Sequence, residues 1–512
     1  MLQQFFGKTF WCTLGGIALI FCLAIPAYFF PALSWILLAG IGLGVFILSL
    51  WKLEMGLFIA FAELIAFSHG HLIEAHGISL RMVIFGAVLL AWGIQFLRRK
   101  VKLSLGHPLF FPFTGLFLLA LCAFGQAYLL RGDLTIALQD GNAYFYILYL
   151  LPVLSVPWES IQKRRWIQVF IASSLWVGIL TLGIVFIFSH TPEWMLVNTY
   201  AFLRDTRLAE ITKMTDAIFR TFLPSQIYTL FLLFFLAPFF WLRSLSWKEG
   251  IILACAQGVG FATLLISLSR SYLVGLFAGA CVFLLALVLS RSVSRKQIFP
   301  AIGWHALSKM FGIIFLVIAL FLPISYLHGQ AGDWANIFSS RAGSTQDAAI
   351  SSRWKLLDPM WQTIKEHPIL GSGFGKTVSF ETDDPRAEAV TGDKIWTTYA
   401  MEWGWLELWL KMGILGPLVF LWIAFVIIQG LRPLLAQPAR WLAIGGLASL
   451  AMLYTTHLFS PYLNHPLGIG FLLFLVPFLE TLPQKQTVPV LVKEKVRSQP
   501  QASPALGSMR LE

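Results

Sequence analysis

Charged residues are scarce in this sequence. Only 12% of its 512 residues are charged, whereas 58% are hydrophobic, and a typical soluble domain carries about a quarter charged residues. This low charged fraction excludes an ordinary water-soluble protein. Cysteine is scarce as well, because all five cysteines fall within apolar runs and none has CxxC spacing. We therefore expect neither a disulfide framework nor a zinc site.

Long apolar runs make up most of the chain. They are about 15 to 25 residues long, the length that a helix needs to cross ~30 Å of hydrocarbon. They predict an all-α polytopic membrane protein with about fourteen transmembrane helices. The runs lie at about 9–25, 31–51, 55–69, 81–97, 108–130, 142–157, 166–188, 219–243, 250–268, 271–290, 307–327, 408–430, 440–458 and 464–481.

Basic residues exceed acidic ones, with 37 Lys and Arg against 25 Asp and Glu and a net charge of +12. In a soluble protein this excess would suggest a nucleic-acid partner. Here the cations cluster between apolar runs, so by the positive-inside rule they mark cytoplasmic connections and place both termini in the cytoplasm. We expect no nucleic-acid partner. The clusters contain Arg98, Arg99, Lys100, Lys163, Arg164, Arg165, Arg243, Lys248, Arg291, Arg295, Lys296, Arg432 and Arg440.

Three connections then lie on the outer side. The first is short and carries His69, His71 and His76, the second covers about 189–218, and the third is much the longest, at 328–405. The third mixes Trp, Gly, Asp and Arg, which is not a linker composition, and so predicts a small, partly helical external subdomain. The predicted organisation is transmembrane helices 1–11 in 1–327, this subdomain in 328–405, helices 12–14 in 406–482, and a disordered cytoplasmic tail in 483–512.

Two arginines lie at the outer membrane boundary. Arg270 stands between Ser269 and Ser271, where the chain must turn between two apolar runs, and Arg220 opens the run 219–243. Charges at a membrane boundary often mark a site, and a guanidinium group there can bind phosphate while it stays near water. The alternative for Arg270 is an arginine that only snorkels at a helix end. Two converging cations suit an anionic lipid pyrophosphate.

The long connection contains a predicted helix. Trp354, Leu357 and Trp361 follow Arg353 with the spacing of one helical face, and His367 before Pro368 predicts the helix end. The Gly371-x-Gly373-x-Gly375 sequence that follows predicts a tight turn. On its own it is weak evidence for phosphate binding, because no strand–turn–helix context surrounds it.

Glu402 stands at the start of a predicted amphipathic helix that enters the membrane. Trp403 and Trp405 beside it suit the interfacial aromatic belt. One interpretation is that Glu402 caps the helix N-terminus. The other is that partial burial among the tryptophans makes it a base for an acceptor hydroxyl. Glu407 is predicted to face elsewhere.

These motifs together resemble the O-antigen ligase and O-antigen polymerase superfamily of bacterial envelope glycan transferases. The resemblance covers residues 250–430 most clearly. It implies a GT-C-like membrane enzyme of the bacterial inner membrane, involved in polysaccharide or lipopolysaccharide synthesis, whose donor is a glycan linked to polyprenyl (undecaprenyl) pyrophosphate. The motifs are Ser269-Arg270-Ser271, Arg353-Trp354, His367 to Gly375, and Gly413-Ile414-Leu415-Gly416.

One position departs from the pattern of the ligase branch. That branch typically has a His followed by Asn, Ser or Gln eleven residues before the first glycine of the closing Gly-x-x-Gly. Counting back from Gly413 reaches Glu402, which Trp403 follows. The resemblance therefore leaves the choice between ligase and polymerase open and favours a polymerase or another glycan transfer.

The resemblance implies roles for the candidate residues. Arg270 and Arg220, with Arg353 as a third candidate, would hold the donor pyrophosphate, and Glu402 would orient or deprotonate the hydroxyl of a glycan or glycolipid acceptor. Transfer would invert the anomeric centre, and it would need neither a metal nor another cofactor because guanidinium groups meet the phosphates. Asp383-Asp384 is interpreted as loop surface. The predicted substrate-binding residues are Arg353, Ser269, Ser271, Trp403 and Trp405.

The main alternative is a transporter for a small anion or a glycolipid, since cationic outer residues and many membrane helices suit both classes. A transporter favours polar residues at mid-membrane depth and helices broken by Gly or Pro in matching halves. Here the apolar runs are strongly hydrophobic at mid-depth and the polar candidates cluster on one side. The pattern therefore favours an enzyme that acts at one membrane face.

Overall fold

The computed structural model describes residues 2–131, 134–215, 218–291, 293–322, 348–382 and 392–479. These residues are mainly helical, with three two-stranded antiparallel sheets. The predicted all-α polytopic class is confirmed. The predicted tail 483–512 and the pair Asp383-Asp384 lie outside the described residues. The division of the chain into predicted domains stays a prediction.

Nine helices of the described chain are long and apolar enough to cross a membrane. Most agree with predicted runs, because an uninterrupted apolar stretch of this length has no other way to satisfy its backbone hydrogen bonds in lipid. They are α2 (Lys8–Phe29), α3 (Pro31–Trp51), α5 (Leu80–Leu97), α6 (Phe110–Arg131), α9 (Ser160–His190), α12 (Trp247–Ser267), α13 (Arg270–Leu289), α14 (Arg295–Phe321) and Leu415–Ala436, which joins α19 (Leu415–Leu431) to η2 (Arg432–Ala436).

Shorter elements fill the other predicted crossings. Residues 142–157, predicted as one membrane helix, begin as a 3-10 helix that turns into a short α-helix. The shorter elements are α4 (Leu53–Ala66), α7 (Thr135–Gly141), η1 (Asn142–Tyr149), α8 (Leu150–Ser155), α11 (Gln226–Leu242), α20 (Arg440–Thr456), η3 (Tyr462–Asn464), α21 (Pro466–Leu475) and η4 (Val476–Phe478), and a single short helix, α1 (Leu2–Phe5), precedes α2.

Two predicted helix boundaries are wrong. The run 219–243 begins as the strand β4 (Ile218–Phe222), and helix α11 starts only at Gln226, so Arg220 lies in a strand and does not open a helix. The predicted helix 408–430 is broken, because α18 (Gly404–Met412) ends at Gly413, which has φ +66°. A positive φ is the left-handed region that favours glycine and stops a helix.

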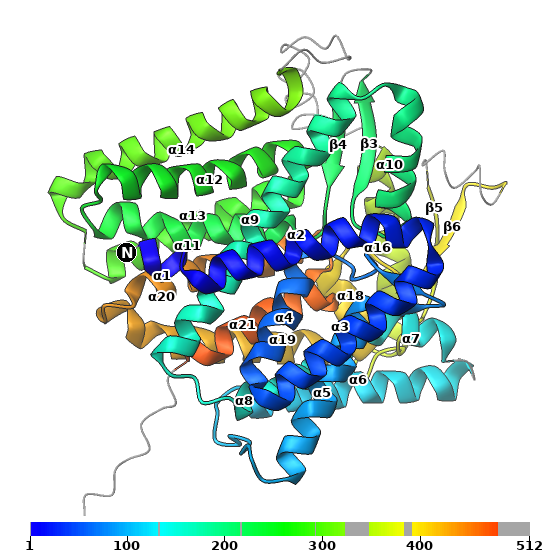
Figure 1. The fold of residues 1–512 in the computed structure, drawn as a ribbon. Helices are drawn as coiled ribbons and strands as arrows, with labels where there is room; N and C mark the ends of the chain where they lie inside the picture. Colours follow the sequence, from blue (N-terminus) through cyan, green and yellow to red (C-terminus); the bar gives the residue numbers. More distant parts are fainter. Residues whose placement is uncertain are drawn as a thin grey trace, which may run out of the picture.

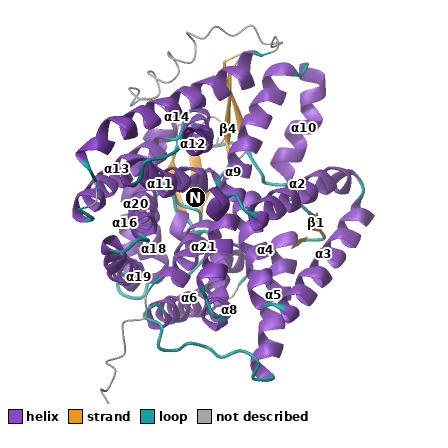
Figure 2. Cartoon of the chain, turned by 60° about the vertical axis from the view of Figure 1, so that its left-hand side comes forward, coloured by secondary structure: helices purple, strands orange, loops and turns teal. Residues whose placement is uncertain are grey.

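The helices form two groups around a shared centre (Figures 1 and 2). Helices α12, α13 and α14 lie on one side and α2 to α5 on the other, and Figure 2 shows both groups from the N-terminal end. Helix α9 contacts α2 and α4 of one group and α12 and α14 of the other, and α11 packs against α20 and α12. The largest hydrophobic cluster runs through all of these helices.

The two ends of the bundle differ in chemistry. Helix α12 begins beside Lys248, where Ser246 and Glu249 form a capping box, and ends at Ser267, whereas α13 returns from Arg270 to the basic residues that follow Leu289. The basic clusters therefore share one end, called here the basic end. The opposite end, called the strand end, carries the sheets, which lie toward the right in Figure 1.

The strand end is built from short elements between the long helices. Helix α10 and the β3–β4 hairpin follow α9, and β4 contacts both α9 and α12. Helix α16 packs against β5 and α18. The elements are β1 (Glu74–Ala75), β2 (Ile78–Ser79), α10 (Glu193–Asp205), β3 (Glu210–Thr215), β4, α16 (Ala348–Glu366), β5 (Val378–Glu381), β6 (Ile395–Thr398) and α18.

Helix α16 confirms the helix that was predicted after Arg353, and it ends at Glu366, just before His367. Its buried face differs from the predicted stripe. Leu356, Met360 and Ile364 pack into a small cluster with α18 and β5, whereas Trp354 and Trp361 are exposed.

Candidate functional site

The turn that carries Arg270 is held by its own hydroxyl groups. Leu268 adopts a left-handed conformation, the backbone N–H of Ser269 donates to Oγ of Ser267 over 3.3 Å, and α13 begins at Arg270. Ser269 Oγ lies 3.0 Å from Ser271 Oγ, and both serines are buried. Arg270 is half-buried at the head of the helix. The turn predicted at this position is confirmed.

Arg220 reaches the same turn from the hairpin. In β4 it pairs with Thr212 of β3, its Nε donates to the carbonyl of Ser267 over 2.9 Å, and its guanidinium lies 5.0 Å from the ring centroid of Phe222. A strand therefore carries one arginine to the backbone that precedes the other. The two predicted cations meet at one turn of the strand end.

The segment between α20 and α21, residues 456–465, is the centre of this end. Ser460 Oγ donates to Ser271 Oγ over 3.1 Å, which ties the segment to the Arg270 turn. The hydroxyls of Tyr462 and Tyr272 share a hydrogen bond, and they lie 2.9 and 3.3 Å from the carbonyl oxygen of Pro224. Because each hydroxyl has one proton, one tyrosine donates to the other, which in turn donates to this carbonyl. Pro224 follows β4. Residues 456–465 thus join the hairpin to the head of α13.

Arg353 and Glu402 form an ion pair between α16 and the residues just before α18. Arg353 is 34% exposed and Glu402 52%. The indole N–H of Trp403 donates to the carbonyl of Arg353 over 2.8 Å, and the Trp403 ring lies 5.7 Å from that of Phe459. Phe459 precedes Ser460, so the pair is attached to the same central segment.

The capping interpretation of Glu402 finds no support. The N-cap residue of α18 is Trp403, and no side chain makes a cap hydrogen bond there. The Glu402 carboxylate instead faces the guanidinium of Arg353. A carboxylate in a partly exposed ion pair remains able to accept a proton or a hydrogen bond from a ligand.

Trp405 fixes the start of α18 against α20. Its N–H donates to the carbonyl of Tyr454 over 3.3 Å, and its ring stands edge-on to His457 at 5.0 Å. His457 is fully buried, and its Nδ1 accepts from the N–H of Leu463 over 3.2 Å. A side chain at Gly404 would collide with His457. Trp405 therefore acts here as a packing residue, and its predicted contact with substrate stays a prediction.

The glycine-rich turn 371–375 is a joint between helices. Gly371, Gly373 and Gly375 all have positive φ, between +74° and +80°. A Cβ atom at Gly373 would lie 2.8 Å from the carbonyl of Ala123. The N–H groups of Ser372 and Gly373 donate to the carbonyls of residues 410 and 411 in α18, at 2.7 and 3.1 Å. These donors are used inside the protein, so the turn is not a phosphate loop.

A buried charge cluster lies beneath this turn. Lys411 Nζ donates to Oδ1 of Asp140 over 2.5 Å and also pairs with Glu407, and all three side chains are at most 6% exposed. Asp140 also accepts from the N–H of Gly375 over 2.7 Å. Burial lowers the pKa of Lys411, but the two carboxylates raise it by more, so its net pKa lies above the usual value. Glu407 faces away from Glu402, as predicted.

Two histidines meet at the strand end. His69, which follows α4, and His465, which caps α21, lie 3.2 Å apart between Nδ1 and Nε2. Beside them Arg81 binds Glu63 through two N–H groups, at 3.1 and 3.2 Å. Ser68 Oγ lies 2.9 Å from Ser225 Oγ, which connects this pair to the residues after β4.

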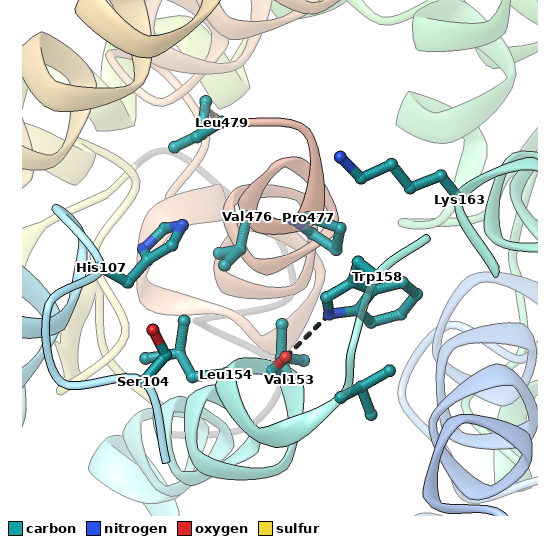
Figure 3. Close-up of a pocket in the computed structure, with 10 residues that line it drawn as sticks. Ser104, His107, Val153, Leu154, Trp158, Lys163, Val476, Pro477 and Leu479 are labelled. Atoms are coloured by element: carbon teal, nitrogen blue, oxygen red, sulfur yellow. Dashed lines mark hydrogen bonds between the residues drawn. The ribbon is translucent and has the colours of Figure 1, made fainter. Parts of the chain in front are cut away.

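A cavity of about 460 Å³ opens at the basic end (Figure 3). Lys163, His107 and Trp158 line it together with the residues after α21, and the indole N–H of Trp158 donates to the carbonyl of Val153 over 2.8 Å. None of the predicted site residues borders this cavity. It lies at the end opposite the arginines and is not part of the candidate site.

The structure thus places the predicted residues around one segment of the strand end. Arg220, Arg270, Ser269 and Ser271 meet at one turn, and the Arg353, Glu402, Trp403 and Trp405 side chains join it through residues 454–460. Within the described ranges, no group of three His, Cys, Asp or Glu side chains is placed to hold a metal ion.

Sequence reasoning missed the central segment itself. The letters THLFSPYLNHP at 456–466 interrupt two apolar runs with His, Ser, Tyr and Asn but with no charge. Their position on the predicted outer side, like that of His69, was the available signal. Neutral polar residues change hydropathy little, and the two predicted spans took in most of them.

Residues 255–421 match the family model described as O-antigen ligase. The matched region contains Arg270, Arg353 and Glu402, the turn 371–375 and helix α18. It ends before the central segment, and Arg220 lies upstream of it. No curated protein matches the chain.

Replacing Lys411 by Met should destabilise the protein strongly. It would leave Asp140 and Glu407 buried without their cation, and breaking such a buried pair costs about 3–5 kcal/mol. Unfolding of the purified protein in detergent, followed by tryptophan fluorescence, measures the effect. The matched variant Lys376→Met removes a half-buried lysine whose exposed partner Glu366 lies 3.6 Å away, and it should change the midpoint of unfolding little. Equal midpoints for the two variants would contradict the structural role of the cluster.

Proposed function

We propose that this chain, whose residues 255–421 match the family model described as O-antigen ligase, is a membrane glycosyltransferase of the O-antigen ligase and polymerase superfamily. Its donor is a glycan linked to polyprenyl pyrophosphate, and its acceptor is a sugar hydroxyl of a glycan or glycolipid. The reaction takes place at the strand end. The observation that carries the proposal is the meeting of Arg220 and Arg270 at one turn, beside the Arg353–Glu402 pair.

The two arginines suit the pyrophosphate. Guanidinium groups bind phosphate oxygens through paired N–H donors. The guanidinium of Arg220 is held against the Ser267 carbonyl, so it does not have to be ordered at the moment of binding, and the backbone of Arg270 is fixed at the first residue of α13. Fixed cations stabilise negative charge that develops on a leaving group. Arg220 and Arg270 therefore stabilise the departing polyprenyl pyrophosphate.

Glu402 activates the acceptor. The acceptor oxygen attacks the anomeric carbon, the bond from that carbon to the pyrophosphate oxygen breaks, and the hydroxyl proton passes to the Glu402 carboxylate. The electron pair of the broken bond leaves with the pyrophosphate. Because the acceptor oxygen attacks the anomeric carbon on the face opposite the pyrophosphate, the configuration of the anomeric centre is inverted. Arg353 orients the carboxylate and turns toward the donor phosphates as they bind.

The strand end is the periplasmic end in this proposal. The basic clusters lie at the other end of the helices, and the positive-inside rule assigns them to the cytoplasm. The location is then the bacterial inner membrane with both termini cytoplasmic. The polyprenyl chain lies among the membrane helices, and the elements α16, β5 and β6 flank the site from outside.

Replacing Arg270 by Ala should lower glycan transfer by about 10²–10³-fold, the usual loss when a preorganised donor to a developing anion is removed. Product formation from native lipid-linked glycan in membranes measures it. Arg204→Ala is the matched control, because Arg204 is 64% exposed in α10 and pairs with Asp205. Full activity of the Arg270 variant would overturn the proposed site, and transport without any glycan product would favour the transporter alternative.

Replacing Glu402 by Gln should reduce kcat by about 10²-fold or more and leave donor affinity nearly unchanged, since the amide keeps the shape but cannot take a proton. The measurement is kcat and KM for donor in the same assay. Glu366→Gln changes another exposed carboxylate of the same region and should have no effect. An unchanged kcat would remove Glu402 from the chemistry.

Activity should persist in the presence of a strong chelator, because arginines carry out the charge compensation for which many transferases use a divalent cation. Transfer is measured with EDTA and then after Mg²⁺ or Mn²⁺ is added back. Loss of activity that either ion restores would contradict the metal-independent mechanism.

A further inference from the structure

The imidazoles of His69 and His465 form an ordered pair whose protons can be assigned. His465 precedes α21, and its Nδ1 accepts a hydrogen bond from the backbone N–H of Leu467 over 3.2 Å. An atom that accepts from an amide carries no proton, so in the neutral ring the proton is on Nε2. That Nε2 lies 3.2 Å from Nδ1 of His69.

The same logic determines the tautomer of His69. Because His465 Nε2–H donates, His69 Nδ1 must accept, and the proton of a neutral His69 is on its own Nε2. No described residue hydrogen bonds to this second nitrogen, and the His69 side chain is only partly buried. The backbone of α21 thus fixes His69 as an N–H donor that points away from the pair.

The turn that carries His69 is rigid. The N–H of Gly70 donates to the carbonyl of Phe67 over 2.9 Å, and Gly70 has φ +80°. A Cβ atom at Gly70 would lie 2.6 Å from Arg81. Arg81 is itself locked to Glu63. Placement on such a turn preorganises the donor.

Burial and neighbouring charges keep His69 neutral. Burial and, after it, the charges of Arg81, His71 and Arg207 together lower the pKa of His69 to about 4. Glu63 neutralises Arg81, and His71 pairs with Glu74 at 2.5 Å. His69 is therefore a fixed neutral donor at ordinary pH.

The pair lies beside the transfer site. Ser68 contacts Ser225, the residue after Pro224, and the Pro224 carbonyl lies within hydrogen-bond distance of the Tyr272 and Tyr462 hydroxyls. Tyr272 lies two residues after Arg270, and His465 ends the central segment. The His69 turn and the Arg270 turn thus contact the same short stretch after β4.

We propose that His465 and His69 form a hydrogen-bonded relay that presents the Nε2–H of His69 to an oxygen of the lipid-linked glycan donor. The inference rests on the proposed function and adds a binding residue to that site. A neutral N–H donor suits either a phosphate oxygen or a sugar oxygen. His465 is a positioning residue, because it acts through the tautomer of His69.

Four variants test the relay by affinity for two probes, sugar-free polyprenyl pyrophosphate and complete lipid-linked glycan. His69→Leu removes the donor and should weaken binding of at least one probe by about tenfold or more, the usual effect of losing a hydrogen bond to a charged group. His69→Gln keeps an N–H donor and should retain most of the affinity. His465→Asn keeps a good helix cap but cannot order His69, so it should give an intermediate loss at unchanged thermal stability. Arg270→Ala is measured in parallel.

Each outcome decides a different point. A loss with both probes assigns the contact to the pyrophosphate, and a loss with the glycan alone assigns it to the sugar. Equal impairment of His69→Leu and His69→Gln would mean a packing role and would overturn the relay. Unchanged affinity in His69→Leu, with a clear loss in Arg270→Ala, would overturn the relay but leave the proposed function standing. Unchanged affinity in Arg270→Ala would contradict the proposed function itself.

Discussion

The buried contact of Lys411 with Asp140 and Glu407 is the interaction on which the strand end depends. It joins α18 to α7, and the same residues hold the glycine-rich turn, since Asp140 accepts from Gly375 and the Lys411 carbonyl accepts from Gly373. Charges at most 6% exposed are costly to separate. Helix α18 is therefore fixed at its C-terminal end. The N-terminal end of α18, which follows Glu402 and Trp403, is fixed by the hydrogen bond from Trp405 to the Tyr454 carbonyl of α20.

The glycines matter because backbones approach closely at this joint. The Gly371–Gly375 turn lies against α6 and α18, and Arg131 of α6 donates to the carbonyls of Ser372 and Phe374. A Cβ at Gly371 would lie 2.5 Å from the backbone of Lys411. The sequence motif first resembles a phosphate loop, yet its N–H groups bind protein carbonyls. In the proposed function, anion binding is assigned instead to side chains on more open turns.

The sequence predicted the architecture well where one physical signal dominates. Long apolar runs gave most of the helices, and the Arg270 turn followed because two runs must reverse between Ser267 and Ser271. Arg220 was placed near the right boundary but in the wrong element. Residues 218–222, IFRTF, are apolar and aromatic in either a strand or a helix, and only pairing with β3 decides between them. The central segment escaped notice because contacts between Ser460 and Ser271, or Tyr462 and Tyr272, join positions about 190 residues apart.

The Lys411 cluster and the Arg353–Glu402 pair both join basic to acidic side chains, but they differ in burial and so in their consequences for function. The Lys411 cluster is buried, so separating it costs several kcal/mol and it stays fixed. The Arg353–Glu402 pair is 34% and 52% exposed, and such pairs contribute only about 0–1 kcal/mol. In the proposed mechanism, a donor phosphate would therefore replace Glu402 as the partner of Arg353 at little cost in free energy. That exchange would release the carboxylate just when a donor is bound, so acceptor activation would depend on donor binding. Such an exchange requires both features: the buried Lys411 cluster keeps α18 in place, and the exposed Arg353–Glu402 pair separates easily.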